Sequence, residues 1–95
     1  MRIRDFQNMM RQIYFDRDLK RGAVRTYNWL VEEVGELGEA MEDQNVKDME
    51  REFADVLAWL ASLANVVSID LEKAAKRKYD NRCPKCGSSP CRCPF

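Results

Sequence analysis

The stretch Leu30-Val-Glu-Glu-Val-Gly-Glu-Leu-Gly-Glu-Ala-Met41 decides the fold. Its largest apolar residues recur at every third or fourth position, at Leu30, Val34, Leu37 and Met41. This spacing is the period of an α-helix that packs one face against a neighbour, and it predicts a helix from about Val24 to Glu42. Glu33 and Glu36 lie three positions apart, which places them next to each other along one flank of the apolar stripe.

The same period predicts a first and a third helix, and a capping residue predicts a fourth. The first runs from about Arg2 to Phe15, and the charged segment 16–22 that follows is predicted to be a loop. Asn45 and Asp70 are suitable N-caps for the third and fourth helices, the fourth ending near Tyr79. The third helix is expected to bury one apolar stripe, which consists of Met49, Phe53, Val56, Leu60, Leu63 and Val67. Since no segment alternates with period two, the predicted fold class is all-α, a four-helix subunit in which the second and third helices form an antiparallel hairpin.

Length and composition exclude several classes of protein. Ninety-five residues form one small domain with a shallow core, so we expect a partner subunit. Lys and Arg number 16, and so do Asp and Glu, so the chain has no net charge with which to attract nucleic acid generally. The longest apolar stretch, 56–61, is far short of the roughly 20 residues of a membrane span. Because the first residues do not resemble a signal peptide, we expect a cytoplasmic protein that does not bind membranes.

A second acidic set occupies the matching flank of the third predicted helix. Steps of about 100° per residue place Glu52, Asp55 and Trp59 beside its apolar stripe. An antiparallel hairpin that turns near Gln44 then aligns the two helices in one register, which pairs Glu33 with Asp55, Glu36 with Glu52, and Trp29 with Trp59. Because one register satisfies all three pairs, we expect the four carboxylates to converge on one side of the hairpin.

Converging carboxylates repel one another unless a cation neutralises them. A ligand set made only of oxygen atoms suits Mg²⁺ or Mn²⁺, the hard cations that also bind polyphosphates. The alternative is a solvated helix face paired with Lys and Arg, which is common in a chain with 34% charged residues. The shared register favours the metal site over the solvated face.

The segment Val31-Glu-Glu-Val-Gly-Glu-Leu37, followed after a turn by Glu52-Phe-Ala-Asp-Val-Leu57, resembles the signature of the MazG family of nucleotide pyrophosphohydrolases, and the resemblance extends from about Trp29 to Lys78. It implies an all-α homodimer or homotetramer that uses Mg²⁺ to cleave nucleoside triphosphates, NTP or dNTP, to monophosphate and pyrophosphate, removing unwanted nucleotides. By position it implies that the metal-binding and catalytic residues are Glu33, Glu36, Glu52 and Asp55. Glu32 matches the first acid of the motif, but it lies nearly opposite the core stripe and is expected to have a supporting role.

The resemblance implies metal-assisted attack of water on one phosphorus, and any of the four carboxylates could accept the proton. Two alternatives differ from this prediction. One is an enzyme similar to phosphoribosyl-ATP pyrophosphohydrolase, which belongs to the same superfamily. The other is a non-catalytic helical dimer that uses its cysteine-rich tail as an interaction module.

Several residues could bind the nucleotide itself. The resemblance implies a phosphate-binding Lys on the last helix, matched by Lys78, and a nearby polar residue that is either Asn81 or Arg82. Trp29 and Trp59 offer surfaces on which a base could stack, or they pack against other parts of the protein. The cations in and after the predicted loop, which include Arg17 and Arg21, could reach phosphate, but keeping the loop soluble is the default expectation.

The four cysteines, at positions 83, 86, 91 and 93, separate a tail from the rest of the chain. We expect an all-α MazG-like domain at 1–82 and a zinc-knuckle-like tail at 83–95. Two chelating pairs, Cys83 with Cys86 and Cys91 with Cys93, match the four thiolates of a tetrahedral structural Zn²⁺ site. Disulfides and a disordered reduced tail are the alternatives.

Overall fold

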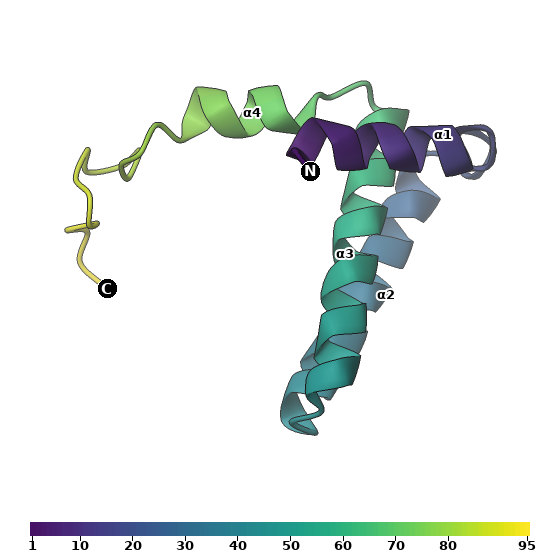
Figure 1. Ribbon diagram of the computed structural model, residues 1–95, viewed down its shortest axis with the longest axis horizontal. Coiled ribbons are helices and arrows are strands. Elements are labelled where there is room, and N and C mark those ends of the chain that lie inside the picture. Colours follow the sequence, from purple (N-terminus) through teal and green to yellow (C-terminus); the bar gives the residue numbers. More distant parts are fainter.

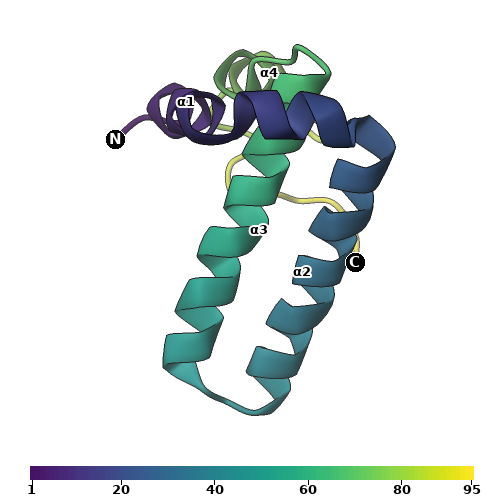
Figure 2. The same cartoon turned by 90° about the vertical axis from the view of Figure 1, so that its right-hand side faces the viewer.

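The computed structural model describes all 95 residues and contains four helices and no strand. The helices are α1 (Ile3–Arg21), α2 (Ala23–Glu42), α3 (Val46–Val66) and α4 (Leu71–Lys78). α2 and α3 form the antiparallel hairpin, and α1 lies across its open end (Figures 1 and 2). α4 extends away from the hairpin, and the C-terminal segment continues beyond it (Figure 1). The predicted all-α class is confirmed.

The N-caps of the last two helices are formed by the residues that the sequence indicates. The side-chain oxygen of Asn45 accepts a hydrogen bond from the backbone N–H of Asp48 at 3.2 Å. Asp70 accepts one from the backbone N–H of Lys73 at 3.0 Å. Each cap satisfies a backbone donor that has no partner inside its helix, which explains why α3 and α4 start where they do.

The first helix is longer than predicted, and the prediction of a loop at 16–22 is wrong. The charged residues of this segment are compatible with a helix, and no Gly or Pro interrupts the segment before Gly22. Arg21 and Asp18 form an ion pair three positions apart, with 2.7 Å between Nη1 and Oδ1. Gly22 has a φ of +84°, which a residue with a side chain rarely adopts, and it separates α1 from α2.

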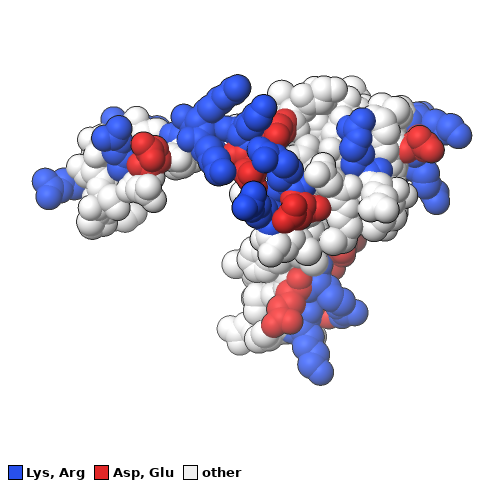
Figure 3. All heavy atoms as spheres, turned by 45° about the horizontal axis from the view of Figure 1, so that its top comes forward, with Lys and Arg blue, Asp and Glu red and all other residues white.

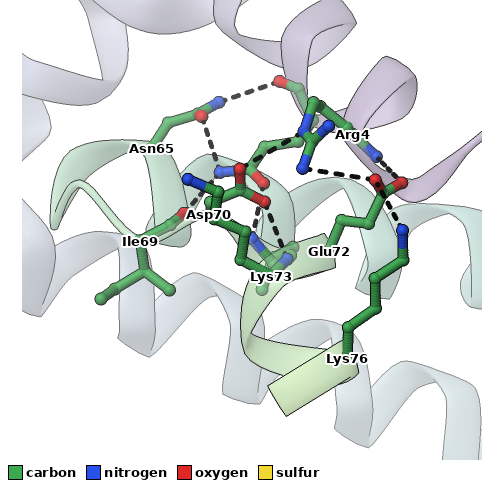
Figure 4. A network of polar contacts seen from close by, with 9 residues as sticks. Arg4, Asn65, Ile69, Asp70, Glu72, Lys73 and Lys76 are labelled. Carbon is green, nitrogen blue, oxygen red and sulfur yellow. Dashed lines mark hydrogen bonds and ion pairs between the residues drawn. The ribbon is translucent and has the colours of Figure 1, made fainter.

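Buried polar side chains join α1, α3 and the start of α4. The Gln7 amide nitrogen donates to the Asn65 side chain at 3.0 Å and to the Ile69 carbonyl at 2.7 Å, while its oxygen accepts from the Leu71 backbone N–H at 2.9 Å. Arg4 adds ion pairs to Asp70 and Glu72 (Figure 4). The hydrogen-bond partners of the Gln7 amide lie on α3, on the segment before α4 and on α4 itself. These bonds therefore fix the direction of α4 relative to α1 and α3.

The apolar stripes are only half covered, contrary to the expectation that the third helix buries its own. Phe53 is 59% exposed, Leu60 40% and Met41 56%. The physical reason is that α1 covers only one end of the hairpin and no helix covers the rest. The radius of gyration, 15.6 Å, exceeds the value of about 12 Å typical of a compact domain of this length. A single chain therefore leaves a large apolar surface exposed to water.

Charge and hydropathy are unevenly distributed. Residues 71–95 carry seven Lys and Arg but only two Asp and Glu, and basic side chains crowd α4 and the C-terminal segment (Figure 3).

No single helix has both the length and the apolar composition needed to cross a membrane. α3 and α4 together have that length and composition, but a bend of 98° separates them.

Candidate functional site

Three of the predicted acidic residues converge in the middle of the hairpin. Glu33 and Glu36 from α2 and Glu52 from α3 each present a carboxylate oxygen within 4.8 Å of the other two. The one-turn spacing on α2 places its two acids side by side, and the antiparallel register brings Glu52 opposite them. Asp55 lies one turn further along α3 and is outside this mutual set, but its negative charge acts on Glu33.

Glu33 is the electrostatic centre of this carboxylate cluster. Burial, the adjacent Glu52 carboxyl, and the negative charges of Glu36 and Asp55 together raise the pKa of Glu33 from 4.5 to about 7. One buried oxygen of Glu33 and one of Glu52 have no hydrogen-bond partner in the protein. A divalent cation would satisfy these oxygens and remove the repulsion, so the donor set fits Mg²⁺ or Mn²⁺.

The two tryptophans confirm the predicted register. The rings of Trp29 and Trp59 stack with centroids 5.9 Å apart and an angle of 17° between their planes. The two predicted roles were stacking of a base and packing within the protein, and the two rings pack against each other. Within this register Glu33 stands next to Glu52 as well as near Asp55. Glu32 is exposed and is not one of the three converging carboxylates.

A cavity of about 340 Å³ lies between α1 and α3 and shares Asp55 with the acidic side of the hairpin. It is lined by Met10, Tyr14, Arg17, Asp18, Arg21, Asp55, Ala58, Trp59 and Ser62. Asp18 was not among the predicted site residues, and Arg17 and Arg21 were predicted either to reach phosphate or to keep a loop soluble. The signal that could have found them is the lack of a helix breaker before Gly22, because a continuous helix places residues 14, 17, 18 and 21 on one face.

The predicted substrate-binding residues Lys78, Asn81 and Arg82 are not brought to the carboxylate cluster within one chain. Lys78 is the last residue of α4, which packs chiefly against α1 and extends away from the hairpin (Figure 1). Asn81 and Arg82 follow in the exposed segment after α4. All three residues therefore lie apart from the carboxylate cluster of their own chain.

The four cysteines form a second candidate metal centre. All are free thiols, and their sulfur atoms lie within 4.8 Å of one another. The Sγ atoms of Cys83 and Cys93 are 3.7 Å apart, and those of Cys86 and Cys91 are 3.9 Å apart. The Gly87 N–H donates to the Cys83 carbonyl at 2.8 Å, and a φ of +73° at Gly87 makes this turn possible. The cluster could bind a metal ion.

Comparison with known proteins identifies the family. A search of curated proteins found no match. Residues 22–87 match the MazG nucleotide pyrophosphohydrolase domain, a range that contains the whole hairpin and α4 and reaches the first two cysteines. This match covers well over half of the chain, and it includes the three converging carboxylates together with Asp55. The chain therefore belongs to the MazG family of nucleotide pyrophosphohydrolases.

Proposed function

We propose that this protein is a Mg²⁺-dependent nucleoside triphosphate pyrophosphohydrolase that releases a monophosphate and pyrophosphate. The observation that carries the proposal is the convergence of Glu33, Glu36 and Glu52 with two buried oxygens that lack a protein partner. A solvated acidic face would leave its oxygens exposed to water. These three residues and Asp55 are the proposed Mg²⁺ ligands.

Each group of residues has a distinct part in the proposed reaction. When bound, Mg²⁺ would neutralise phosphate oxygens and lower the pKa of the attacking water. The carboxylates hold the cation, and one of them accepts the proton of the water. Lys78, with Asn81 or Arg82, binds the polyphosphate and offsets the charge that develops on the leaving group.

We further propose that a second copy of the chain completes the site. An apolar face of the hairpin is exposed in the single chain; we call it the hairpin face, and it consists of Val34, Met41, Phe53, Leu57 and Leu60. Apolar patches of this kind mark interfaces between subunits. A dimer or tetramer built on the hairpin face would bury it and bring the basic α4 of one copy towards the site of another.

The direct test is turnover of a panel of substrates. Purified protein is incubated with Mg²⁺ and each of the common nucleoside and deoxynucleoside triphosphates, and with phosphoribosyl-ATP. Monophosphate and pyrophosphate are then measured. Equimolar release of both from the triphosphates supports the proposal, and turnover restricted to phosphoribosyl-ATP supports the related enzyme instead. If no compound is cleaved, the protein is not a pyrophosphohydrolase of this kind.

The raised pKa of Glu33 predicts an unusual pH dependence of stability. Its folded pKa is about 7 and its ordinary value 4.5, so between these values the folded state holds a proton that the unfolded state has lost. The stability that this proton provides is complete below pH 4.5 and is lost as pH rises through 7. We therefore expect the melting temperature without added Mg²⁺ to fall between pH 5 and pH 8, and added Mg²⁺ to restore it at pH 8.

Glu33→Gln is the control for this measurement, because glutamine is neutral throughout the range. Its melting temperature should vary less with pH than that of the wild type. Asp70, whose pKa is lowered by the Lys73 N–H and by Arg4, is ionised over the whole range and does not contribute to the slope. Cys86, whose pKa is lowered to about 6 chiefly by the Arg92 N–H, adds the opposite slope to both proteins, so the difference between them is the quantity that isolates Glu33. Identical pH dependence in the wild type and Glu33→Gln would contradict the role given to Glu33.

We also propose that the cysteine cluster holds a structural Zn²⁺. Zinc bound to four thiolates at about 2.3 Å has sulfur atoms about 3.8 Å apart along each tetrahedral edge. The two measured distances, 3.7 and 3.9 Å, match that edge. Backbone N–H groups of Arg92 and Cys93 point to the sulfurs of Cys86 and Cys91 at 3.4 and 3.3 Å, the kind of outer contact that orients metal-binding thiolates.

Replacing Cys86 with serine should reduce bound zinc from one ion per chain to near zero, because three thiolates bind far more weakly than four. Metal content is measured by elemental analysis of protein purified with zinc in the medium. Co²⁺ substitution should give the absorption of tetrahedral cobalt thiolate in the wild type and not in Cys86→Ser. The control Arg92→Ala keeps all four thiolates and should keep its zinc. Wild-type protein without bound metal would exclude the zinc site.

A further inference from the structure

The cavity between α1 and α3 is lined by Asp18, which has one buried carboxylate oxygen without a hydrogen-bond partner in the protein. Asp18 is only 1% exposed. Its Oδ1 accepts a hydrogen bond from Arg21 at 2.7 Å, while Oδ2 is buried and has no partner. Because an unpaired buried acceptor destabilises a fold, such atoms in native proteins usually have a specific role. Asp18 lines the cavity, so it is an acidic group that a ligand bound there would meet.

Arg21 provides hydrogen-bond donors immediately beside this acceptor. Its guanidinium carbon lies 4.7 Å from the centroid of the Trp59 ring, and its side chain is largely buried. A guanidinium has five N–H donors, and the bond to Asp18 uses one of them. Two residues that line the cavity therefore combine an unpaired acceptor with free donors, and an ion pair and an aromatic ring hold them in place.

The walls and the size of the cavity suit a flat heterocycle. Met10, Tyr14 and Trp59 provide apolar surface, and the volume of about 340 Å³ is at the small end of the roughly 300–1,000 Å³ typical of ligand sites. Asp55 lines the same cavity and is also a proposed Mg²⁺ ligand. A nucleotide whose phosphates lie at the carboxylates can thus place its base among these side chains.

We infer that this cavity binds the nucleotide base and selects bases whose Watson–Crick edge has an amino group next to an unprotonated ring nitrogen, namely adenine and cytosine. The amino group donates to Oδ2 of Asp18, and Arg21 donates to the ring nitrogen. Guanine presents two adjacent donors, which need both oxygens of Asp18, and Arg21 occupies one of them. Uracil and thymine place a carbonyl on each side of their N–H, so one carbonyl faces the carboxylate. The inference rests on the proposed function for the statement that the ligand is a nucleotide.

The test is equilibrium binding of dCMP, dAMP, dGMP and dTMP, with the quenching of tryptophan fluorescence as the measure of binding. We expect dCMP and dAMP to bind at least about tenfold more tightly than the other two, the ratio typical of one hydrogen bond to a charged group. Asp18→Asn should abolish the difference, because the amide is uncharged and its own N–H competes for the position. Asp16→Asn, an exposed change two residues away on the same helix, is the matched control and should keep the difference.

A second variant keeps the inference testable if Asp18→Asn does not fold. Arg21→Lys retains the positive charge but loses the fork of donors, so the preference for amino bases should fall. Equal affinities for the four monophosphates in the wild type, or an unchanged preference in both variants, would overturn the inference.

Binding and turnover separate this inference from the proposed function. Selective binding of dCMP and dAMP without hydrolysis of any triphosphate would support base recognition and contradict the proposed function. Hydrolysis of all four deoxynucleoside triphosphates with equal kcat/KM would leave the function intact and overturn the base selectivity.

Discussion

Replacing Glu36 with glutamine is expected to lower kcat for nucleoside triphosphates by about a hundredfold to a thousandfold, the range typical when one stabilising group is removed from a preorganised site. Glutamine keeps the size of the side chain but removes one of three negative charges that lie within 4.8 Å of one another. The site then attracts Mg²⁺ more weakly, and the phosphate charge is less well neutralised. The measurement is the initial rate of pyrophosphate release over a range of Mg²⁺ concentrations.

The matched control is Glu39→Gln, which changes the same side chain one turn further along α2, at an exposed position outside the carboxylate cluster. Its rate should stay within a factor of about two of the wild type, since exposed charges interact weakly with their surroundings. An undiminished rate in Glu36→Gln at low Mg²⁺ concentration would remove this residue from the proposed metal site.

Phe53→Asp is expected to weaken subunit association by roughly a hundredfold or more. Burying one phenylalanine side chain is worth about 1.5–3 kcal/mol, and a two-fold interface contains each residue twice. In the single chain Phe53 is 59% exposed, so the substitution removes little from the subunit itself. The dissociation constant is measured by analytical ultracentrifugation, and far-UV circular dichroism checks that the helices are intact.

Turnover should fall together with association, because the dissociated chain has no basic α4 near its own carboxylates. Ile13→Asp is the control, since Ile13 is an equally exposed apolar residue on α1, outside the hairpin face. It should leave the oligomer and the rate close to those of the wild type. If Phe53→Asp remains assembled and fully active, the hairpin face is not the interface that completes the site.

The sequence was sufficient to predict the features that depend on helical period. The spacing of apolar residues predicted the first part of α1, α2 and α3, the cap at Asp70 predicted α4, and the caps at Asn45 and Asp70 are present. A single register predicted the stacked tryptophans and the convergence of Glu36 with Glu52. These features follow from geometry within one or two helices, so no knowledge of the wider packing was needed.

The features that the sequence did not predict depend on contacts between distant segments. The charged residues 16–21 have no apolar period, and only their position against α3 explains why Asp18 is buried there. The opposite error concerns Phe53 and Leu60, whose spacing predicted burial although no element of the same chain covers them. An apolar stripe indicates that one face of a helix is buried, but it does not indicate whether the same chain or another one covers that face.

The hydrogen bonds of Gln7 have a further consequence for the symmetry of the proposed assembly. Because they fix the direction of α4 within each chain, the helix cannot swing towards its own carboxylates. In a two-fold pair each chain then gives its Lys78 to its neighbour and receives one in return. A chain that lacks Lys78 would therefore impair its neighbour's site while its own remained complete, so two differently damaged chains could restore one working site between them.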